Sequence, residues 1–204
     1  MKKFFLLVVA AMMTVVTVQA QSGYEDTKHE VAVSLGGASN SQWIDVFEDV
    51  FVSMVGYRFE DGSAFGPLSV EYFYRLKDWL GIGGIFVYGH SEQDVYQGKV
   101  EKANFYGVDK NNYYTLMPAA KFDWLRKKNF GVYSKVGVGA TLRTEKTDYK
   151  DDKDNYDEST LHVNWQLSLL GLEAGGPKFR GFVELGCGEQ GIALIGLRYK
   201  FGSR

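Results

Sequence analysis

Side-chain polarity alternates with a period of two residues in eight segments of this chain. In residues 68–75, for example, apolar and aromatic side chains take the even positions, while Ser69, Glu71 and Arg75 take odd positions. Successive residues of a β-strand point to opposite faces, so the pattern predicts strands with one apolar and one polar face. The predicted strands are residues 30–39, 68–75, 80–90, 113–124, 130–143, 161–173, 179–187 and 192–201.

The connections between these strands alternate between short and long. Short turns are residues 77–78, 126–129 and 175–178, and long loops are residues 40–67, 91–112 and 144–160. An up-and-down meander places alternate connections at opposite ends, and short turns opposite long loops are typical of outer-membrane barrels. Only Glu189-Gln190, between the last two strands, is shorter than this pattern predicts. The fold class predicted is therefore all-β, an eight-stranded antiparallel up-and-down barrel.

The first 20 residues have the parts of a secretory signal peptide. Lys2 and Lys3 precede an apolar run, and Val18-Gln19-Ala20 is typical of a signal-peptidase site. A membrane anchor is the alternative, but the run is short and polar residues follow it. We therefore predict cleavage of residues 1–20 and a single barrel domain over residues 21–204.

The apolar face of these strands must point either into a soluble core or outward into lipid. Tyr and Trp residues gather near the predicted strand ends, as the aromatic girdles of a membrane barrel require. The strand lengths suit a tilted crossing, which needs about 9–11 residues. We therefore predict a transmembrane barrel in the outer membrane, in contact with lipid, and expect Val138, Val163 and Leu197 to face that lipid. A soluble periplasmic barrel carrying a lipophilic ligand is the alternative.

In a membrane barrel the polar face lines the lumen, which eight strands leave just wide enough for side chains. Unpaired buried charges are costly, so acids and bases there should neutralise one another and close the lumen. The predicted ionic network consists of Glu71, Arg75, Lys121, Asp123, Lys135, Arg180, Glu184 and Arg198. The pairing stays open, although Arg180 or Arg198 is the expected neighbour of Glu184. A continuous register leaves Glu173 on the apolar face, so we expect a bulge near Leu169 and Leu170.

The last strand combines alternating apolar residues with an aromatic residue near the C-terminus, in Gly191-Ile-Ala-Leu-Ile-Gly-Leu-Arg-Tyr-Lys-Phe201. It resembles the closing strand that outer-membrane barrels present to the assembly machinery. With Phe182-Val-Glu-Leu-Gly186 and Phe130-Gly-Val-Tyr-Ser-Lys-Val-Gly137, the chain resembles the small outer-membrane β-barrel family common in Bacteroidetes-type bacteria. The resemblance implies a location, a fold and contact with the assembly machinery. It carries no common activity.

The first long loop contains a helical pattern. Trp43, Phe47 and Phe51 recur at helical spacing with acidic residues on the other side, which predicts one short helix with an apolar face. That face could contact lipid or a partner, or pack on the barrel mouth.

Other candidate sites have weaker patterns. A calcium site at Asp151-Asp152-Lys153-Asp154 lacks the glycine and ligand spacing of an EF-hand. A barrel-embedded lipid-modifying enzyme using His162 as its base is an alternative function, but no nucleophile is fixed within reach. The single Cys187 is predicted to be an inert residue on the lipid face. We therefore predict no catalytic residue, metal or cofactor.

The charge is balanced, with 23 Lys and Arg against 25 Asp and Glu, and no dense basic patch predicts nucleic-acid binding. The sequence favours a non-enzymatic barrel that serves envelope integrity, adhesion or recognition through its extracellular loops. The extracellular partner stays open.

Overall fold

The computed structural model describes residues 27–37, 39, 57–97, 104–149 and 157–202. The helix predicted around Trp43, Phe47 and Phe51 lies outside the described residues, as does the acidic stretch 151–154. In the part of the chain that is described, no helix is long and apolar enough to cross a membrane.

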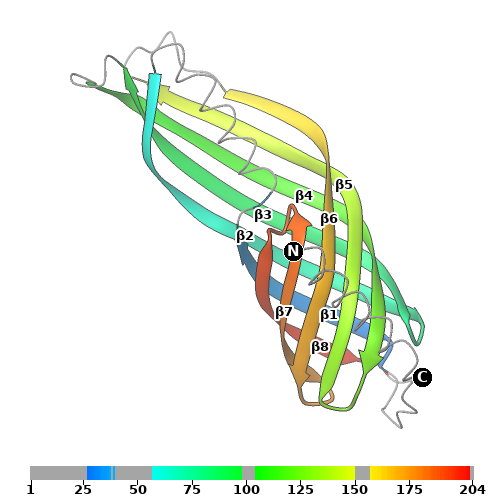
Figure 1. Ribbon diagram of the computed structural model, residues 1–204. Helices are drawn as coiled ribbons and strands as arrows, with labels where there is room; N and C mark the ends of the chain where they lie inside the picture. The colour runs from blue at the N-terminus through cyan, green and yellow to red at the C-terminus, as the bar shows by residue number, and fades with distance from the viewer. Residues whose placement is uncertain (1–26, 38, 40–56, 98–103, 150–156, 203–204) are drawn as a thin grey trace, which may run out of the picture.

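Eight antiparallel strands follow one another around a closed barrel (Figure 1). They are β1 (His29–Gly37), β2 (Tyr57–Lys77), β3 (Leu80–Gln97), β4 (Asn104–Arg126), β5 (Phe130–Tyr149), β6 (Asp157–Gly175), β7 (Phe179–Gly188) and β8 (Ala193–Phe201). Each strand pairs with its neighbour in sequence, and β1 pairs with β8 to close the ring. The predicted all-β class and the closed ring of eight antiparallel strands are confirmed.

The strands differ greatly in length. β1, β7 and β8 have 9, 10 and 9 residues, whereas β2 to β6 have between 18 and 23. β1 pairs with β2 only from Leu68 to Tyr74, and β7 pairs with β6 only from Gln166 to Gly175. β2 to β6 therefore continue past the closed barrel at the loop end as a five-stranded sheet (Figure 1). We call this part the sheet extension; it lies on the loop side of the cross-strand row Leu68, Tyr88, Tyr114, Leu142 and Leu161.

The long loops predicted from the sequence are therefore partly strand. Residues 57–67, 91–97, 104–112, 144–149 and 157–160 were assigned to loops but lie in β2 to β6. A strand that crosses lipid must alternate apolar and polar residues, whereas a strand in water can keep its ladder of hydrogen bonds with polar side chains on both faces. Alternation ends near the membrane surface while the strands continue.

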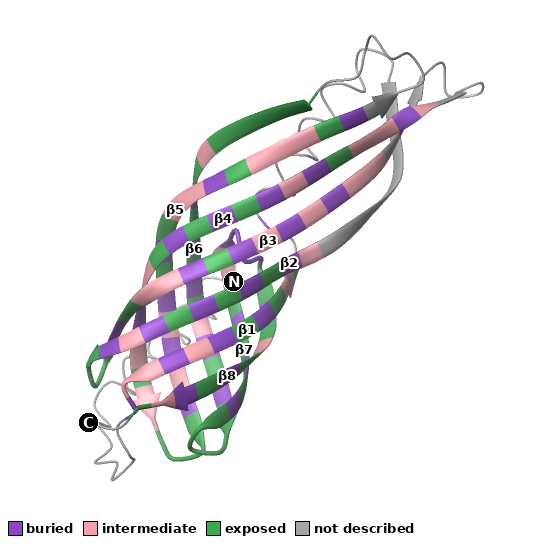
Figure 2. Cartoon of the chain, turned by 180° about the vertical axis from the view of Figure 1, so that it is seen from behind, coloured by how far each residue is buried: buried purple, intermediate pink, exposed green. Residues whose placement is uncertain are grey.

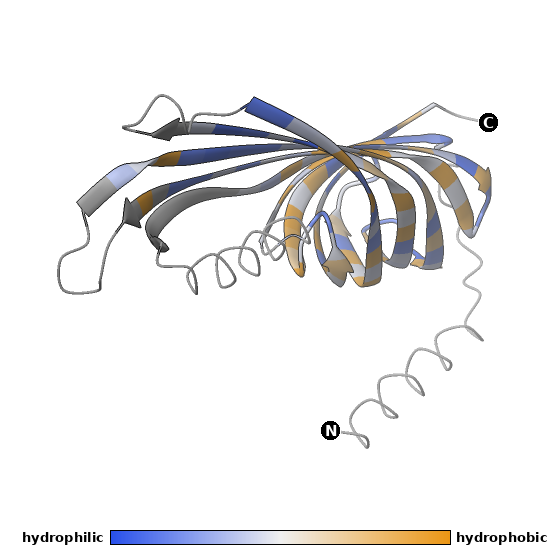
Figure 3. Ribbon diagram, turned by 90° about the horizontal axis from the view of Figure 1, so that it is seen from above, coloured by the Kyte–Doolittle hydropathy of each residue, from blue (hydrophilic) through white to orange (hydrophobic). Residues whose placement is uncertain are grey.

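Buried and exposed residues alternate along the strands of the closed barrel (Figure 2). Apolar side chains such as Val33, Val138 and Leu197 are about half exposed on the outer wall, whereas charged side chains are buried in the lumen. Colouring by hydropathy shows the same alternation in the closed barrel and mainly polar residues on the described part of the sheet extension (Figure 3). This inverted pattern is the one that a lipid environment requires.

Several aromatic side chains gather near the two ends of the outer wall of the closed barrel. Trp79, Trp124, Phe130 and Phe179 lie beside the short turns. Tyr88 and Tyr114 pair across β3 and β4 near the start of the sheet extension, with ring centroids 5.4 Å apart. Two such groups mark the two interfaces of a membrane.

Candidate functional site in the charged lumen

The lumen of the closed barrel holds a dense group of charged side chains. Each of the following residues is at most 7% exposed: Glu30, Glu71, Arg75, Lys121, Lys135, Glu173, Arg180, Glu184, Arg198 and Lys200. The Asp123 side chain joins them at 4% exposure. They project inward because each occupies the polar face of its strand. All eight residues of the predicted network lie in this group.

Lys135 on β5 lies at the centre of the group, between two carboxylates. It donates to Glu71 of β2 and lies 2.9 Å from an Oε atom of Glu184 of β7. Arg198 of β8 contacts the same two acids from the other side, at 3.5 Å from Glu71 and 3.8 Å from Glu184. Tyr133 and Ser168 also donate to Glu184, at 2.7 and 2.6 Å.

A second group of charges gathers around Glu30 of β1. Glu30 accepts hydrogen bonds from Arg75 and from Lys121, the latter at 2.6 Å. Asp123 lies 3.3 Å from Lys121 and 3.7 Å from Arg75. Two acids and two bases from β1, β2 and β4 thus neutralise one another near the turn end of the barrel.

Glu173 of β6 links three basic residues from β7 and β8. It accepts from Arg180 and Arg198, each at 2.6 Å, and from Lys200. The pairing of β6 shifts register between Ser168 and Leu170 of β6, and this irregularity turns Glu173 into the lumen. The bulge expected near Leu169 and Leu170 is confirmed.

The partner of Glu184 differs in part from the expectation. Arg198 does approach Glu184, but Arg180 binds Glu173 and the backbone carbonyls of Lys127 and Lys128 instead. Lys135 takes the place expected of Arg180. Arg180 lies at the turn end of β7, four residues before Glu184.

Several residues of the group were absent from the predicted network. Glu30, Glu173 and Lys200 lie on the polar faces of their strands. The alternation of residues along each strand therefore identifies them from the sequence, once the bulge before Glu173 is taken into account. Tyr133 shares the odd-numbered inner face of β5 with Lys135, and its ring centroid lies 4.4 Å from the Lys121 Nζ atom and 4.5 Å from the Arg198 Cζ atom. The lumen also holds an apolar cluster of Phe73, Ile85, Val87 and Met117, which lie on the odd-numbered inner faces of β2, β3 and β4.

The short turn between β7 and β8 folds into the lumen on the loop side of the charges. Glu189 and Gln190 are 1% and 0% exposed. Gln190 donates to Glu71 at 2.8 Å, and Glu189 accepts from Thr115 of β4 and Asn164 of β6, at 3.2 and 2.7 Å. Gly188 and Gly191 bracket these residues with φ angles of +132° and +106°, which side chains rarely adopt. The turn therefore spans the barrel between facing walls.

His162 does not have the surroundings of a catalytic base. It lies on the inner face of β6 opposite Thr141, and within the described residues its Nε2 atom has no hydrogen-bond partner. Ser168, the nearest hydroxyl considered for catalysis, donates to Glu184 instead. Among the side chains described, no group of three or more His, Cys, Asp or Glu residues is arranged to hold a metal ion. Cys187 is partly exposed and in the reduced form.

The sheet extension carries a second set of charges on its outer face. Glu92, Lys110, Lys146 and Asp157 are cross-strand neighbours in that order on β3, β4, β5 and β6. Lys110 lies 3.5 Å from Glu92. In this row the two lysines lie side by side with an acid at each end, and the row faces water.

Comparison with known proteins gives one family match and weak structural similarity. The family model described as "Outer membrane protein beta-barrel domain" matches residues 8–173, most of the chain. Two crystal structures of Ail, the attachment invasion locus protein of Yersinia pestis, align with this chain at 13% and 12% identity, each with a TM-score of 0.44. The alignments cover 85% and 87% of this chain and 99% of each Ail chain; one of the two structures is a complex with the heparin analogue sucrose octasulfate. A search of the curated proteins finds no match.

Proposed function

Because this chain belongs to the outer membrane protein beta-barrel domain family and lies in the outer membrane, we propose that it is a closed, non-enzymatic barrel whose sheet extension serves adhesion or recognition. Residues 1–20 act as its cleaved signal peptide. Its C-terminal strand supports a place among the small barrels of Bacteroidetes-type bacteria. Phe201 stacks on His29 at the β1–β8 seam, with ring centroids 5.2 Å apart, and would be the residue that the assembly machinery reads before closure.

The filled lumen supports the closed part of this proposal. Charged side chains from seven of the eight strands contact one another in the lumen, and Gln190 of the β7–β8 turn binds the same network. A diffusing solute would have to separate pairs that are largely withdrawn from water, which costs several kcal/mol per pair. The barrel is therefore a scaffold and not a channel.

The sheet extension is the single observation that supports a role in recognition. Five strands continue beyond the membrane-crossing barrel, with polar side chains on the outer face. An ordered sheet presents a fixed surface to a partner at a lower entropic cost than flexible loops would. A barrel that served only envelope integrity would not require such an extension.

Planar-bilayer recording tests the closed barrel. The wild-type protein, refolded without its leader, should give no steady conductance. Glu184→Ala removes a carboxylate that Lys135, Tyr133 and Ser168 share, and should admit ions. Large, steady conductance from the wild type would contradict the closed barrel.

A shortened variant tests recognition by the sheet extension. Ser91 pairs with Asn111, and Thr144 pairs with Ser159, so residues 92–110 and 145–158 can each be replaced by a two-residue Asn-Gly turn without changing the barrel register. Cells that display this variant should lose attachment to immobilised extracellular proteins and glycans that the wild type binds. Equal amounts of folded barrel, shown by different gel mobility of unheated and boiled samples, are the control. Unchanged attachment would contradict the proposal.

Two alternatives have less support. A soluble periplasmic barrel is incompatible with the outer-membrane location. A barrel-embedded lipid-modifying enzyme would need a nucleophile beside His162, and the hydroxyl of Thr141 opposite His162 is already hydrogen-bonded to Thr115 and Asn164. If the wild type hydrolyses lipid and a His162→Ala variant does so at the same rate, His162 has no part in that hydrolysis.

A further inference from the structure

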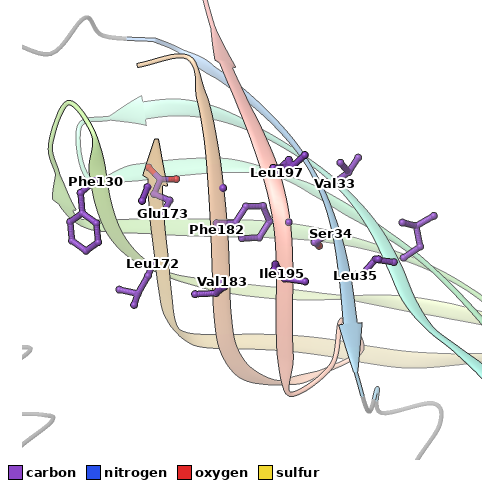
Figure 4. A pocket seen from close by; sticks show the side chains of 14 residues that line it. Val33, Ser34, Leu35, Phe130, Leu172, Glu173, Phe182, Val183, Ile195 and Leu197 are labelled. Atoms are coloured by element: carbon purple, nitrogen blue, oxygen red, sulfur yellow. The ribbon is translucent and has the colours of Figure 1, made fainter. Parts of the chain in front are cut away.

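The outer wall of the closed barrel has an apolar groove over β6, β7, β8 and β1 (Figure 4). Its volume is about 760 Å³, within the range of roughly 300–1,000 Å³ that ligand sites occupy. Phe130 and Leu172 line one side, and Ile195, Leu197 and Val33 line the other. These side chains are 36–65% exposed in the protein alone, and they face the lipid of the membrane.

Small residues form the floor of this groove. Phe130, Ala174, Gly181, Leu197 and Val33 are successive cross-strand partners on β5, β6, β7, β8 and β1. The second and third members, Ala174 and Gly181, leave a depression between the ring of Phe130 and the side chain of Leu197. A Cβ atom added at Gly181 would meet only the Ala174 carbonyl oxygen, at 4.0 Å, so the space above it is open.

The groove ends beside two basic turns. Phe130 and Ala174 adjoin residues 127–129 and 175–178, and the Gly175 amide donates to the Asn129 carbonyl at 2.9 Å, which holds the two turns together. Buried Arg180 also donates to the carbonyls of Lys127 and Lys128, at 2.8 and 2.9 Å.

These two turns carry positive charge without compensating acids. Lys127, Lys128 and Lys178 are exposed, and the turns contain no Asp or Glu. None of these three lysines forms an ion pair with another described residue of the protein. Their backbone is fixed while their ammonium groups remain available.

We propose that this groove binds one acyl chain of an anionic phospholipid from the leaflet on the turn side, with the lipid phosphate held by Lys128 and Lys178. The apolar lining matches a hydrocarbon chain, and the lysines at its end match a negatively charged head group. A lysine near a membrane surface attracts anionic lipid by about 1 kcal/mol, so two or three give a selective site. The second apolar groove, over β2 to β5, is lined on β4 and β5 only by residues at least seven positions from Lys127 and Lys128.

The test uses the leaderless chain refolded in nanodiscs of equal phosphatidylglycerol and phosphatidylcholine. Lipids retained after transfer to detergent are identified by native mass spectrometry. The wild type should retain about one phospholipid, with a preference for phosphatidylglycerol. Gly181→Leu, which fills the floor, should abolish retention of both lipids. Lys128→Gln with Lys178→Gln should keep retention but lower the preference for phosphatidylglycerol by roughly tenfold.

Matched variants separate a site from general membrane contact. Ala140→Leu makes a similar change on the outer wall away from the groove, and Lys28→Gln with Lys77→Gln removes two other charges at the turn end. Both should behave as the wild type. Absence of retained lipid in the wild type, or equal loss of preference in both lysine pairs, would overturn the proposal. If Gly181→Leu fails to fold, the variant with Lys128→Gln and Lys178→Gln still tests the proposal.

Discussion

Lys135 illustrates how single residues make a charged lumen compatible with a stable barrel. Its ammonium group is fully buried and contacts both Glu71 and Glu184. A buried charge is tolerated when opposite charges and hydrogen bonds replace the lost water. Because Glu184 also accepts from Tyr133 and Ser168, its carboxylate connects the charges to the neutral polar residues around them.

Loss of the Glu184 charge should therefore be costly. Glu184→Gln keeps the side-chain shape but leaves Lys135 with only Glu71, so the free energy of unfolding should fall by about 3–5 kcal/mol. Urea unfolding in lipid vesicles measures this change.

The matched control is Glu92→Gln on the sheet extension. Glu92 pairs with Lys110 at 3.5 Å but is exposed to water, so its loss should cost less than about 1 kcal/mol. Replacing Lys135 and Glu184 together by Met and Leu should restore much of the stability lost in Glu184→Gln. Equal effects of Glu92→Gln and Glu184→Gln would show that the lumen pairs are solvated.

Arginine substitutions on the outer wall should show where the hydrocarbon layer lies on the barrel. Val183 lies in the middle of β7, so Val183→Arg would place a charge within the hydrocarbon layer and should cost about 2–4 kcal/mol of folding into vesicles. Val163 is also on the outer wall, but it lies on the loop side of Trp165, where β6 has lost its pairing with β7. Val163→Arg should therefore cost only about 0–1 kcal/mol. A larger loss of stability in Val163→Arg than in Val183→Arg would mean that the hydrocarbon layer lies closer to the sheet extension.

The alternation of residues along each strand predicted which charged residues face the lumen. It did not predict which of them contact one another. Glu71, Lys121 and Arg198 can be assigned to one face from the sequence, since alternation is a local property. The contact between Lys135 and Glu71 joins β5 to β2 across the lumen, and the register and tilt that bring them together are properties of the whole ring.

The β7–β8 turn closes the loop side of the lumen. Gly191 has a φ of +106°, and a Cβ there would lie 2.4 Å from the Gly37 carbonyl oxygen. Gly191→Ala should destabilise the barrel by about 1–3 kcal/mol and weaken the Gln190–Glu71 hydrogen bond, which bilayer recording would detect as leakage. Gly37→Ala is the matched control, because its Cβ would meet nothing within 4 Å. A silent and stable Gly191→Ala variant would contradict this role for the turn.

The sequence predicted the existence of the eight strands better than their ends. β7 and β8 end close to their expected limits because lipid contacts nearly their whole length. β2 begins at Tyr57, 11 residues before the first alternating residue, Leu68, because beyond the membrane pairing with β3 maintains the strand without an apolar face. The inward β7–β8 turn had only its shortness as a signal; its burial depends on facing residues such as Thr115 and Asn164.

The whole molecule has different chemistry at its two ends. In the described part of the chain, the turn end carries six basic residues and Asp78; the basic residues are Lys28, Lys77, Arg126, Lys127, Lys128 and Lys178. The connection between β5 and β6, residues 150–156, includes Lys150 and Lys153 among acids. Both ends thus contain trypsin sites, and short turns in outer-membrane barrels face the periplasm.

Trypsin added to intact cells should therefore cut at Lys150 or Lys153 and spare Arg126 to Lys128 and Lys178. The outer membrane keeps the protease away from the turns, although Lys127, Lys128 and Lys178 are exposed in the protein itself. Mass spectrometry of the fragments identifies the cut. Permeabilised cells are the control, because there the protease can reach both ends. Cleavage of the turns in intact cells, with residues 150–156 spared, would reverse the orientation and place the sheet extension on the periplasmic side, where it could not recognise an extracellular partner.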